Sequence, residues 1–86
     1  MPKFIIEREF AEQLNVTTES ARLINDINAE EGVQWLISFL SADKKKTYCL
    51  YEAPSADAIR EAARRLNIPA DTIIELGGQL RPEMFA

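Results

Sequence analysis

The chain has 86 residues, of which 47% are hydrophobic and 28% are charged, and its formal net charge is −4. This length allows one domain, over residues 1–86, since a second hydrophobic core would not fit, and the composition excludes a disordered chain. The acidic balance argues against nucleic-acid binding, which needs a concentrated basic surface. No run approaches the roughly 20 apolar residues that span a bilayer, so we expect no membrane segment.

Two residue types narrow the chemistry further. The sequence contains no His, which excludes Ser-His and Cys-His catalysis and every metal motif that includes His. Cys49 is the only cysteine, so no intramolecular disulfide can form, and a single unpaired thiol suits a reducing compartment. The N-terminal residues turn polar by Glu7, whereas a signal peptide needs a longer apolar stretch. We therefore expect a cytoplasmic protein.

The first half of the chain predicts a strand, a helix and a second strand. Residues 3–10 are rich in Ile and Phe, which is typical of a strand. Thr17 can cap a helix whose apolar residues recur at three- and four-residue spacing, and Gly32 can end that helix. Residues 33–42 are strand-like throughout.

The second half predicts the same three elements in the same order. A short charged loop at 43–46 joins the second strand to the β-rich run 47–53, and this arrangement predicts a hairpin. Ser55 can cap a second helix and Asn67 can end it. Residues 72–80 supply the last strand, with a bulge or kink expected at its two adjacent glycines.

The predicted order is strand, helix, strand, strand, helix, strand, which is the βαββαβ pattern of ferredoxin-like α+β domains. Each strand-helix-strand half crosses over right-handedly, and this places both helices on one face of the sheet. We therefore expect an antiparallel four-stranded sheet of strand order 4-1-3-2, with two helices on one face and an open face opposite.

Alternation along the first and last strands assigns their side chains to these two faces. In the first strand Phe4 and Ile6 oppose Glu7, and in the last strand Ile74 opposes Glu75. The apolar sets should face the helices. Glu7 and Glu75 are therefore expected on the open face, on neighbouring strands.

The second strand is apolar on both sides, with Trp35 and Phe39 on one side and Leu36 and Leu40 on the other. Both sides should therefore be covered, although two helices can cover only one face. A second subunit is the simplest cover for the open face, so we expect a homodimer. On the third strand, we place Cys49 and Tyr51 on the same open face.

Several stretches of the chain form a familiar combination: Met-Pro-Lys-Phe at 1–4 with Glu-Arg-Glu at 7–9, Glu-Glu-Gly-Val-Gln-Trp at 30–35, Thr-Tyr-Cys-Leu-Tyr-Glu-Ala-Pro at 47–54, and Ile-Arg-Glu-Ala-Ala-Arg-Arg at 59–65. Together they resemble the DUF4242 family, small bacterial ferredoxin-like domains that are also described as nickel-binding. The resemblance spans nearly the whole chain and implies a dimeric ferredoxin-like fold. It implies no settled activity.

The resemblance also implies a divalent metal such as nickel as the cofactor, but the chain departs from the family pattern at two positions. Typical members carry His where this sequence has Ile37, and many carry a second His where it has Ala62. The best nitrogen ligands for nickel are therefore missing, which weakens the nickel interpretation. The cofactor stays unknown at this point.

We place a candidate ligand-binding site on the open face, formed by Glu7, Trp35, Cys49, Tyr51 and Glu75. Its carboxylates could hold a metal ion or act as a general acid or base. Carboxylates alone suit a hard ion such as magnesium better than nickel. Alternatively, they are rim charges, or they pair with Arg8 or Lys3, since structural ion pairs are common. The cysteine could be structural, and the aromatic residues could be the core of a dimer interface.

Three classes of function follow from this site. The first is a non-enzymatic dimeric protein that holds a small ligand or metal ion. The alternative is a cofactor-free enzyme resembling the antibiotic-biosynthesis monooxygenases, with Glu7 or Glu75 as the base; this is an analogy of fold, which does not fix function. The third is a structural or regulatory interaction domain.

Overall fold

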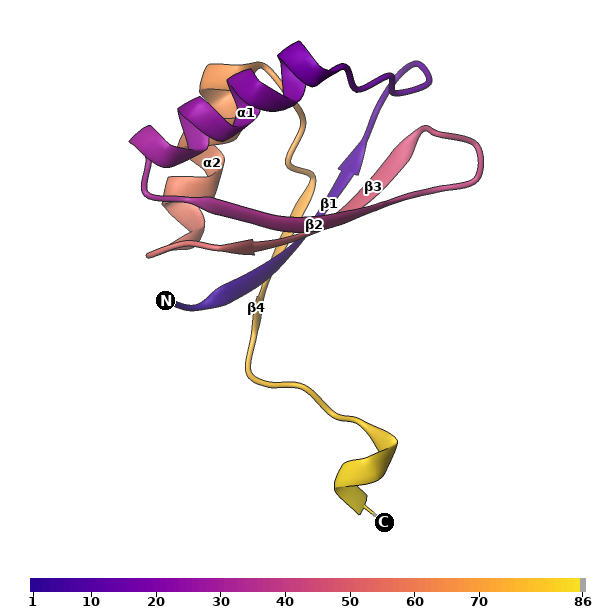
Figure 1. The fold of residues 1–86 in the computed structure, drawn as a ribbon, viewed down its shortest axis with the longest axis vertical. Helices are drawn as coiled ribbons and strands as arrows, with labels where there is room; N and C mark the ends of the chain where they lie inside the picture. The colour runs from indigo at the N-terminus through magenta and orange to yellow at the C-terminus, as the bar shows by residue number, and fades with distance from the viewer. Residues whose placement is uncertain (86) are drawn as a thin grey trace.

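The structure, a computed structural model, describes residues 1–85. Its elements are, in chain order, β1 (Lys3–Glu9), α1 (Thr18–Glu30), β2 (Gln34–Leu40), β3 (Lys46–Glu52), α2 (Ala56–Leu66), β4 (Thr72–Leu76) and the short 3₁₀ helix η1 (Pro82–Phe85). The strands form one antiparallel sheet in the order β2-β3-β1-β4, with both helices on one face (Figure 1). This confirms the predicted α+β fold and its strand order 4-1-3-2, counted from the opposite edge. Within residues 1–85, no helix is long and apolar enough to cross a membrane.

Both helices begin at the residues that the sequence predicts. The Thr17 hydroxyl accepts a hydrogen bond from the Ser20 backbone nitrogen at 3.1 Å, and the Ser20 hydroxyl accepts one from the Thr17 nitrogen at 2.9 Å. This reciprocal pair satisfies two backbone groups at the start of α1. At the start of α2 a single bond caps the helix: the Ser55 hydroxyl accepts from the Ala58 nitrogen at 3.2 Å.

The helices also end as expected. Gly32 follows α1 with a φ of 73°, a left-handed conformation that glycine adopts without steric cost. Asn67 ends α2 in the same region, with a φ of 54°. Asn is one of the few other residues that tolerate this conformation. The chain can therefore turn back sharply towards β2 and β4.

The core lies between the sheet and the helices. On β1, Phe4 and Ile6 point into it, and their partners across the ladder to β3 are Tyr51 and Cys49, respectively. Ile59 of α2 packs against this cluster, and all five residues are buried. The expectation that Cys49 and Tyr51 lie on the open face is therefore wrong, because the ladder places both opposite core residues of β1.

A β-bulge changes the direction of side chains along β2. The ladder pairs Trp35 with Tyr51 and then Ile37 with Leu50, so Leu36 is an extra residue in β2. Simple alternation would place Trp35 with Ile37 and Phe39. The bulge instead turns Trp35 to the helix-covered face, where its indole nitrogen donates to the Ser38 hydroxyl at 2.8 Å. Ile37 and Phe39 stay on the open face.

The last strand is shorter than predicted and its faces are reversed. β4 ends at Leu76, before the two glycines. Its ladder to β1 pairs Ile73 with Ile6 on the helix-covered face and Ile74 with Ile5 on the open face. Glu75 pairs with Phe4 and so belongs to the helix-covered side, at the exposed edge of the sheet. Its expected place on the open face, beside Glu7, is wrong.

The residues after β4 lead away from the domain and end in η1 (Figure 1). Leu80, Met84 and Phe85 are exposed there.

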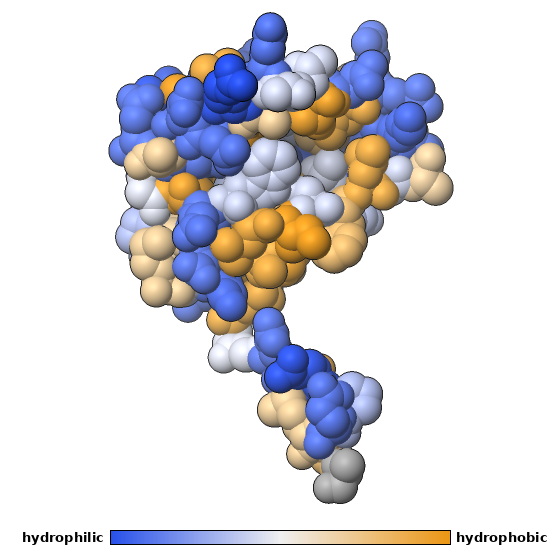
Figure 2. Space-filling model, in the orientation of Figure 1, coloured by the Kyte–Doolittle hydropathy of each residue, from blue (hydrophilic) through white to orange (hydrophobic). Residues whose placement is uncertain are grey.

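The open face of the sheet carries its own apolar residues. One row crosses all four strands, with register partners Ile37, Leu50, Ile5 and Ile74. Figure 2 shows apolar side chains gathered on the side of the sheet away from the helices, above the C-terminal segment.

Candidate functional site

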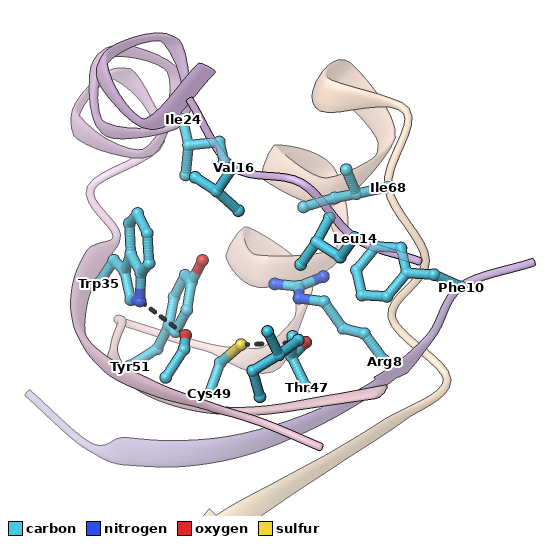
Figure 3. Close-up of a pocket in the computed structure, with 12 residues that line it drawn as sticks. Arg8, Phe10, Leu14, Val16, Ile24, Trp35, Thr47, Cys49, Tyr51 and Ile68 are labelled. Carbon is cyan, nitrogen blue, oxygen red and sulfur yellow. Dashed lines mark hydrogen bonds between the residues drawn. The ribbon is translucent and has the colours of Figure 1, made fainter. Parts of the chain in front are cut away.

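A cavity of about 160 Å³ opens on the helix-covered side of the sheet (Figure 3). Its lining is mainly apolar and comes from the segment after β1, from α1, from three strands and from the segment after α2. Apolar and aromatic side chains make up most of it: Phe10, Leu14, Val16, Ile24, Trp35, Leu40 and Ile68. The polar members are Arg8, Ser38, Thr47, Cys49 and Tyr51.

The segment between β1 and α1 forms one wall because backbone hydrogen bonds fix it to the β2–β3 hairpin. The Phe10 nitrogen donates to the Lys45 carbonyl at 2.8 Å, and the Leu14 nitrogen donates to the Lys44 carbonyl at 2.7 Å. A segment that sequence analysis leaves as irregular is therefore tied at two points. Its Phe10 and Leu14 side chains lie across the cavity from Trp35, and its Val16 side chain lies beside Ile24 (Figure 3).

The cavity contains one formal charge, that of Arg8. Arg8 follows Phe4 and Ile6 on the inward side of β1 and is only 3% exposed. Its Nη1 donates to the Pro69 carbonyl at 2.6 Å, and its guanidinium carbon lies 5.6 Å from the centre of the Tyr51 ring. Both contacts hold the guanidinium at the cavity wall, with its end directed inward in Figure 3.

The other polar side chains of the cavity are neutral. The Cys49 thiol lies 3.5 Å from the Thr47 hydroxyl, and both residues are buried. Burial raises the pKa of the Tyr51 phenol above its ordinary value, although the positive charge of Arg8 acts in the opposite direction. Tyr51 is therefore a protonated hydroxyl at neutral pH, able to donate a hydrogen bond into the cavity.

The five residues expected to form a site fall into two groups. Trp35, Cys49 and Tyr51 come together at the cavity, on the face opposite to the one expected. Glu7 lies on the open face, as expected, and Glu75 lies at the exposed edge of β4. The structure thus brings three of the five together and leaves the two carboxylates outside the cavity.

The open-face carboxylates have a partner that sequence analysis did not consider. Lys46 Nζ lies 2.6 Å from Glu7 Oε1 and 3.3 Å from Glu9 Oε1. Hydrogen bonds to Glu7 first, and to Glu9 second, raise the pKa of Lys46 well above its ordinary value. These carboxylates form an ion-paired cluster, and their expected partners Arg8 and Lys3 are not the ones that the structure supplies.

Nickel would need ligands that the described residues do not assemble. No group of three or more Cys, Asp or Glu side chains within residues 1–85 is placed to hold a metal ion, and the sequence has no His. Cys49, the one soft ligand, lies buried on the other side of the sheet from Glu7. The donor set therefore does not fit a nickel centre.

Arg8 is the functional candidate that sequence analysis missed. Its position was readable from the alternation of Phe4, Ile6 and Arg8, which puts the guanidinium on the same face as two core residues. Arg is almost never fully buried without a partner. The sequence signal for Arg8 is thus a charged residue at a strand position that alternation places on the same face as core residues.

Comparison with known proteins gives a relative and a family. The crystal structure of SCO4226 from Streptomyces coelicolor A3(2) matches with a TM-score of 0.70 and 21% sequence identity, over 91% of this chain and 99% of that chain. At this identity the likeness shows the fold. No curated protein matches the sequence. Residues 4–76 match the profile of the family described as nickel responsive protein SCO4226-like, and the chain belongs to that family.

Proposed function

We propose that the protein is a dimeric, non-catalytic binding protein of the cytoplasm that holds a small, mainly apolar molecule in the cavity of Figure 3. The observation that carries this proposal is the cavity of about 160 Å³, walled by apolar side chains from four parts of the chain: the segment after β1, α1, β2 and the segment after α2. Sites for small molecules are concave and mostly apolar, with a few polar groups that orient the ligand. An engineered apolar cavity of roughly 150 Å³ holds a benzene molecule, so a ligand with one ring matches this volume.

The lining favours binding over catalysis. Proton transfer needs a side chain within hydrogen-bond reach of the reacting atom. Among the described residues, the cavity wall includes no Asp or Glu, and the two carboxylates of the enzyme alternative, Glu7 and Glu75, lie outside it. The monooxygenase-like alternative therefore has no base where a substrate would sit.

The open face supports the dimer. Ile37, Phe39 and Ile74 are 49%, 62% and 53% exposed there. A monomer rarely leaves a contiguous apolar surface of this kind bare. The same apolar row is present on every copy of the chain, so two copies related by a two-fold axis can match apolar surface to apolar surface.

A metal-binding function is the alternative that the family description suggests, and the DUF4242 resemblance points the same way. The charges on the open face argue against metal binding by this chain, because Lys46 already forms ion pairs with Glu7 and Glu9. We therefore assign the ligand to the cavity. We assign the nickel response in the family's description to no residue of this chain.

The single tryptophan offers a direct test, because Trp35 lines the cavity. Titration with toluene, a neutral one-ring probe, should give a saturable change in tryptophan fluorescence. Ile24→Phe narrows the cavity and should abolish that change. Ile74→Phe makes the same substitution on the open face and should preserve it. A fluorescence response that Ile24→Phe leaves intact would overturn the proposal, as would no saturable response in the wild type.

A further inference from the structure

Arg8 stands apart from the other arginines of the chain. Arg60, Arg64, Arg65 and Arg81 lie near the surface, and each pairs with at least one carboxylate. Arg8 is 3% exposed, and none of the ion pairs among residues 1–85 includes it. Arg22 has no ion pair among these residues either, but it is exposed on α1. Among the described residues, Arg8 is therefore the buried arginine without a counter-ion.

A guanidinium has five N–H donors and keeps its charge at any pH at which the protein folds. For Arg8 the structure gives one hydrogen bond, from Nη1 to the Pro69 carbonyl. The Tyr51 ring lies beside the guanidinium, whose central carbon is 5.6 Å from the ring centre. The donors left over adjoin the cavity, because Arg8 is one of its lining residues.

Burying a charge is costly unless an opposite charge or enough hydrogen bonds compensate for it. One carbonyl and one aromatic ring compensate for Arg8 only in part. We infer that Arg8 is the counter-ion of a small aromatic carboxylate, whose anionic group bonds to the guanidinium while its ring fills the apolar part of the cavity. This inference rests on the proposed function, and it names the chemical class of the ligand.

The cavity favours a carboxylate with an apolar body over inorganic phosphate. A guanidinium bonds a carboxylate through two parallel N–H donors, and the remaining wall offers an apolar surface that matches a ring. A free phosphate would need several more donors and would leave Phe10, Leu14 and Ile24 without apolar contact. The Tyr51 hydroxyl, which also borders the cavity, supplies a second donor to the carboxylate.

The test compares benzoate with benzamide, which has nearly the same shape and no charge. Trp35 fluorescence reports binding, and the NMR resonance of the Arg8 Nε–H group reports contact with the guanidinium. Benzoate should bind about tenfold or more tightly than benzamide, because a hydrogen bond between two charged groups exceeds a neutral one. Benzoate should also shift the Arg8 resonance more strongly than benzamide does.

Variants make the assignment specific. Arg8→Met should bring the affinity for benzoate down to that for benzamide, whereas Arg60→Met, which removes an exposed guanidinium, should change neither. Tyr51→Phe keeps the ring against Arg8 and should weaken benzoate binding several-fold. If Arg8→Met does not fold, the wild-type comparison of the two probes and the Tyr51→Phe variant still decide the matter.

The outcomes separate this inference from the proposal on which it rests. Equal affinities for benzoate and benzamide would overturn the role of Arg8 while leaving the cavity as a binding site. Phosphate binding that excludes benzoate would overturn the ligand class. Binding of none of toluene, benzamide and benzoate would overturn both the inference and the proposed function.

Discussion

The two faces of the sheet are built from the same strands and solve opposite problems. On β1, alternate residues send Ile6 and Arg8 under the helices and Ile5 and Glu7 to the open face. The covered face thus holds a charge without a counter-ion, while the open face holds a row of aliphatic side chains and carboxylates that are already paired. A chain that folded only for its own stability would place these groups the other way round. The proposed ligand and the proposed second subunit would each supply what one face lacks: an anion for Arg8 on the covered face, and an apolar cover for the open face.

The largest effect should come from core truncation on the covered face. Ile6 is 0% exposed, so Ile6→Ala should lower the free energy of unfolding by about 2–5 kcal/mol, independently of protein concentration. The matched change on the open face, Ile74→Ala, should destabilise the protein to a degree that grows with protein concentration, because the proposed dimer buries that face. Urea unfolding at two protein concentrations checks both. Equal behaviour of the two variants would remove the distinction between the faces.

A charge on the open face should break the dimer. Phe39→Asp removes apolar area whose loss alone costs about 2–3 kcal/mol per subunit, before the cost of the new charge. Light scattering at micromolar concentration should show a dimer for the wild type and a monomer for this variant. Leu80→Asp, a similar change at an exposed residue beyond the sheet, serves as the control and should stay dimeric. A monomeric wild type would contradict the assignment of the open face.

Nickel should bind weakly to either face. Borderline metals prefer imidazole, and neither Ile37 nor Ala62 supplies it. Calorimetric titration of nickel into the wild type should therefore show weak binding. Lys46→Met, which releases Glu7 and Glu9 from their ion pairs, should strengthen it slightly. Tight, stoichiometric binding by the wild type would show that carboxylates, Cys49 or backbone groups are sufficient ligands.

The smallest effect concerns the ionisation of Tyr51. In a Tyr48→Phe variant it is the only tyrosine, and its absorbance at alkaline pH should show a midpoint above the ordinary value of about 10 because burial raises its pKa. The folded state then holds this proton more tightly than the unfolded chain does, so the free energy of unfolding should fall as pH rises beyond about 10. A midpoint below 10 would show that the charge of Arg8 outweighs burial.

The fold was predictable from local signals that agree with one another. Thr17 and Ser55 cap the helices as expected, and two right-handed crossovers leave only one simple strand order. The faces were less predictable. Along β3, the set Tyr48 and Leu50 is as apolar as the set Cys49 and Tyr51, so alternation alone does not decide which set the helices cover.

The candidate site was mispredicted for two physical reasons. A period-two pattern cannot reveal an inserted residue, so nothing in the run around Leu36 announces the bulge that moves Trp35 to the other face. Arg8 was overlooked because burial of a lone arginine opposes the usual distribution of residues. Both exceptions, the bulge at Leu36 and the burial of Arg8, place a side chain in the wall of the cavity: Trp35 in the first case and Arg8 itself in the second.

The bulge has a consequence for aggregation. β2 is an edge strand, and Leu36, Ile37, Phe39 and Leu40 are all exposed on it. An apolar edge of this kind is a template on which further strands can add, and regular pairing would extend the sheet from one molecule to the next. A bulge twists the edge and interrupts its ladder of backbone groups. The residue that redirects Trp35 therefore also discourages fibre-like growth, and it leaves face-to-face contact as the open route for self-association.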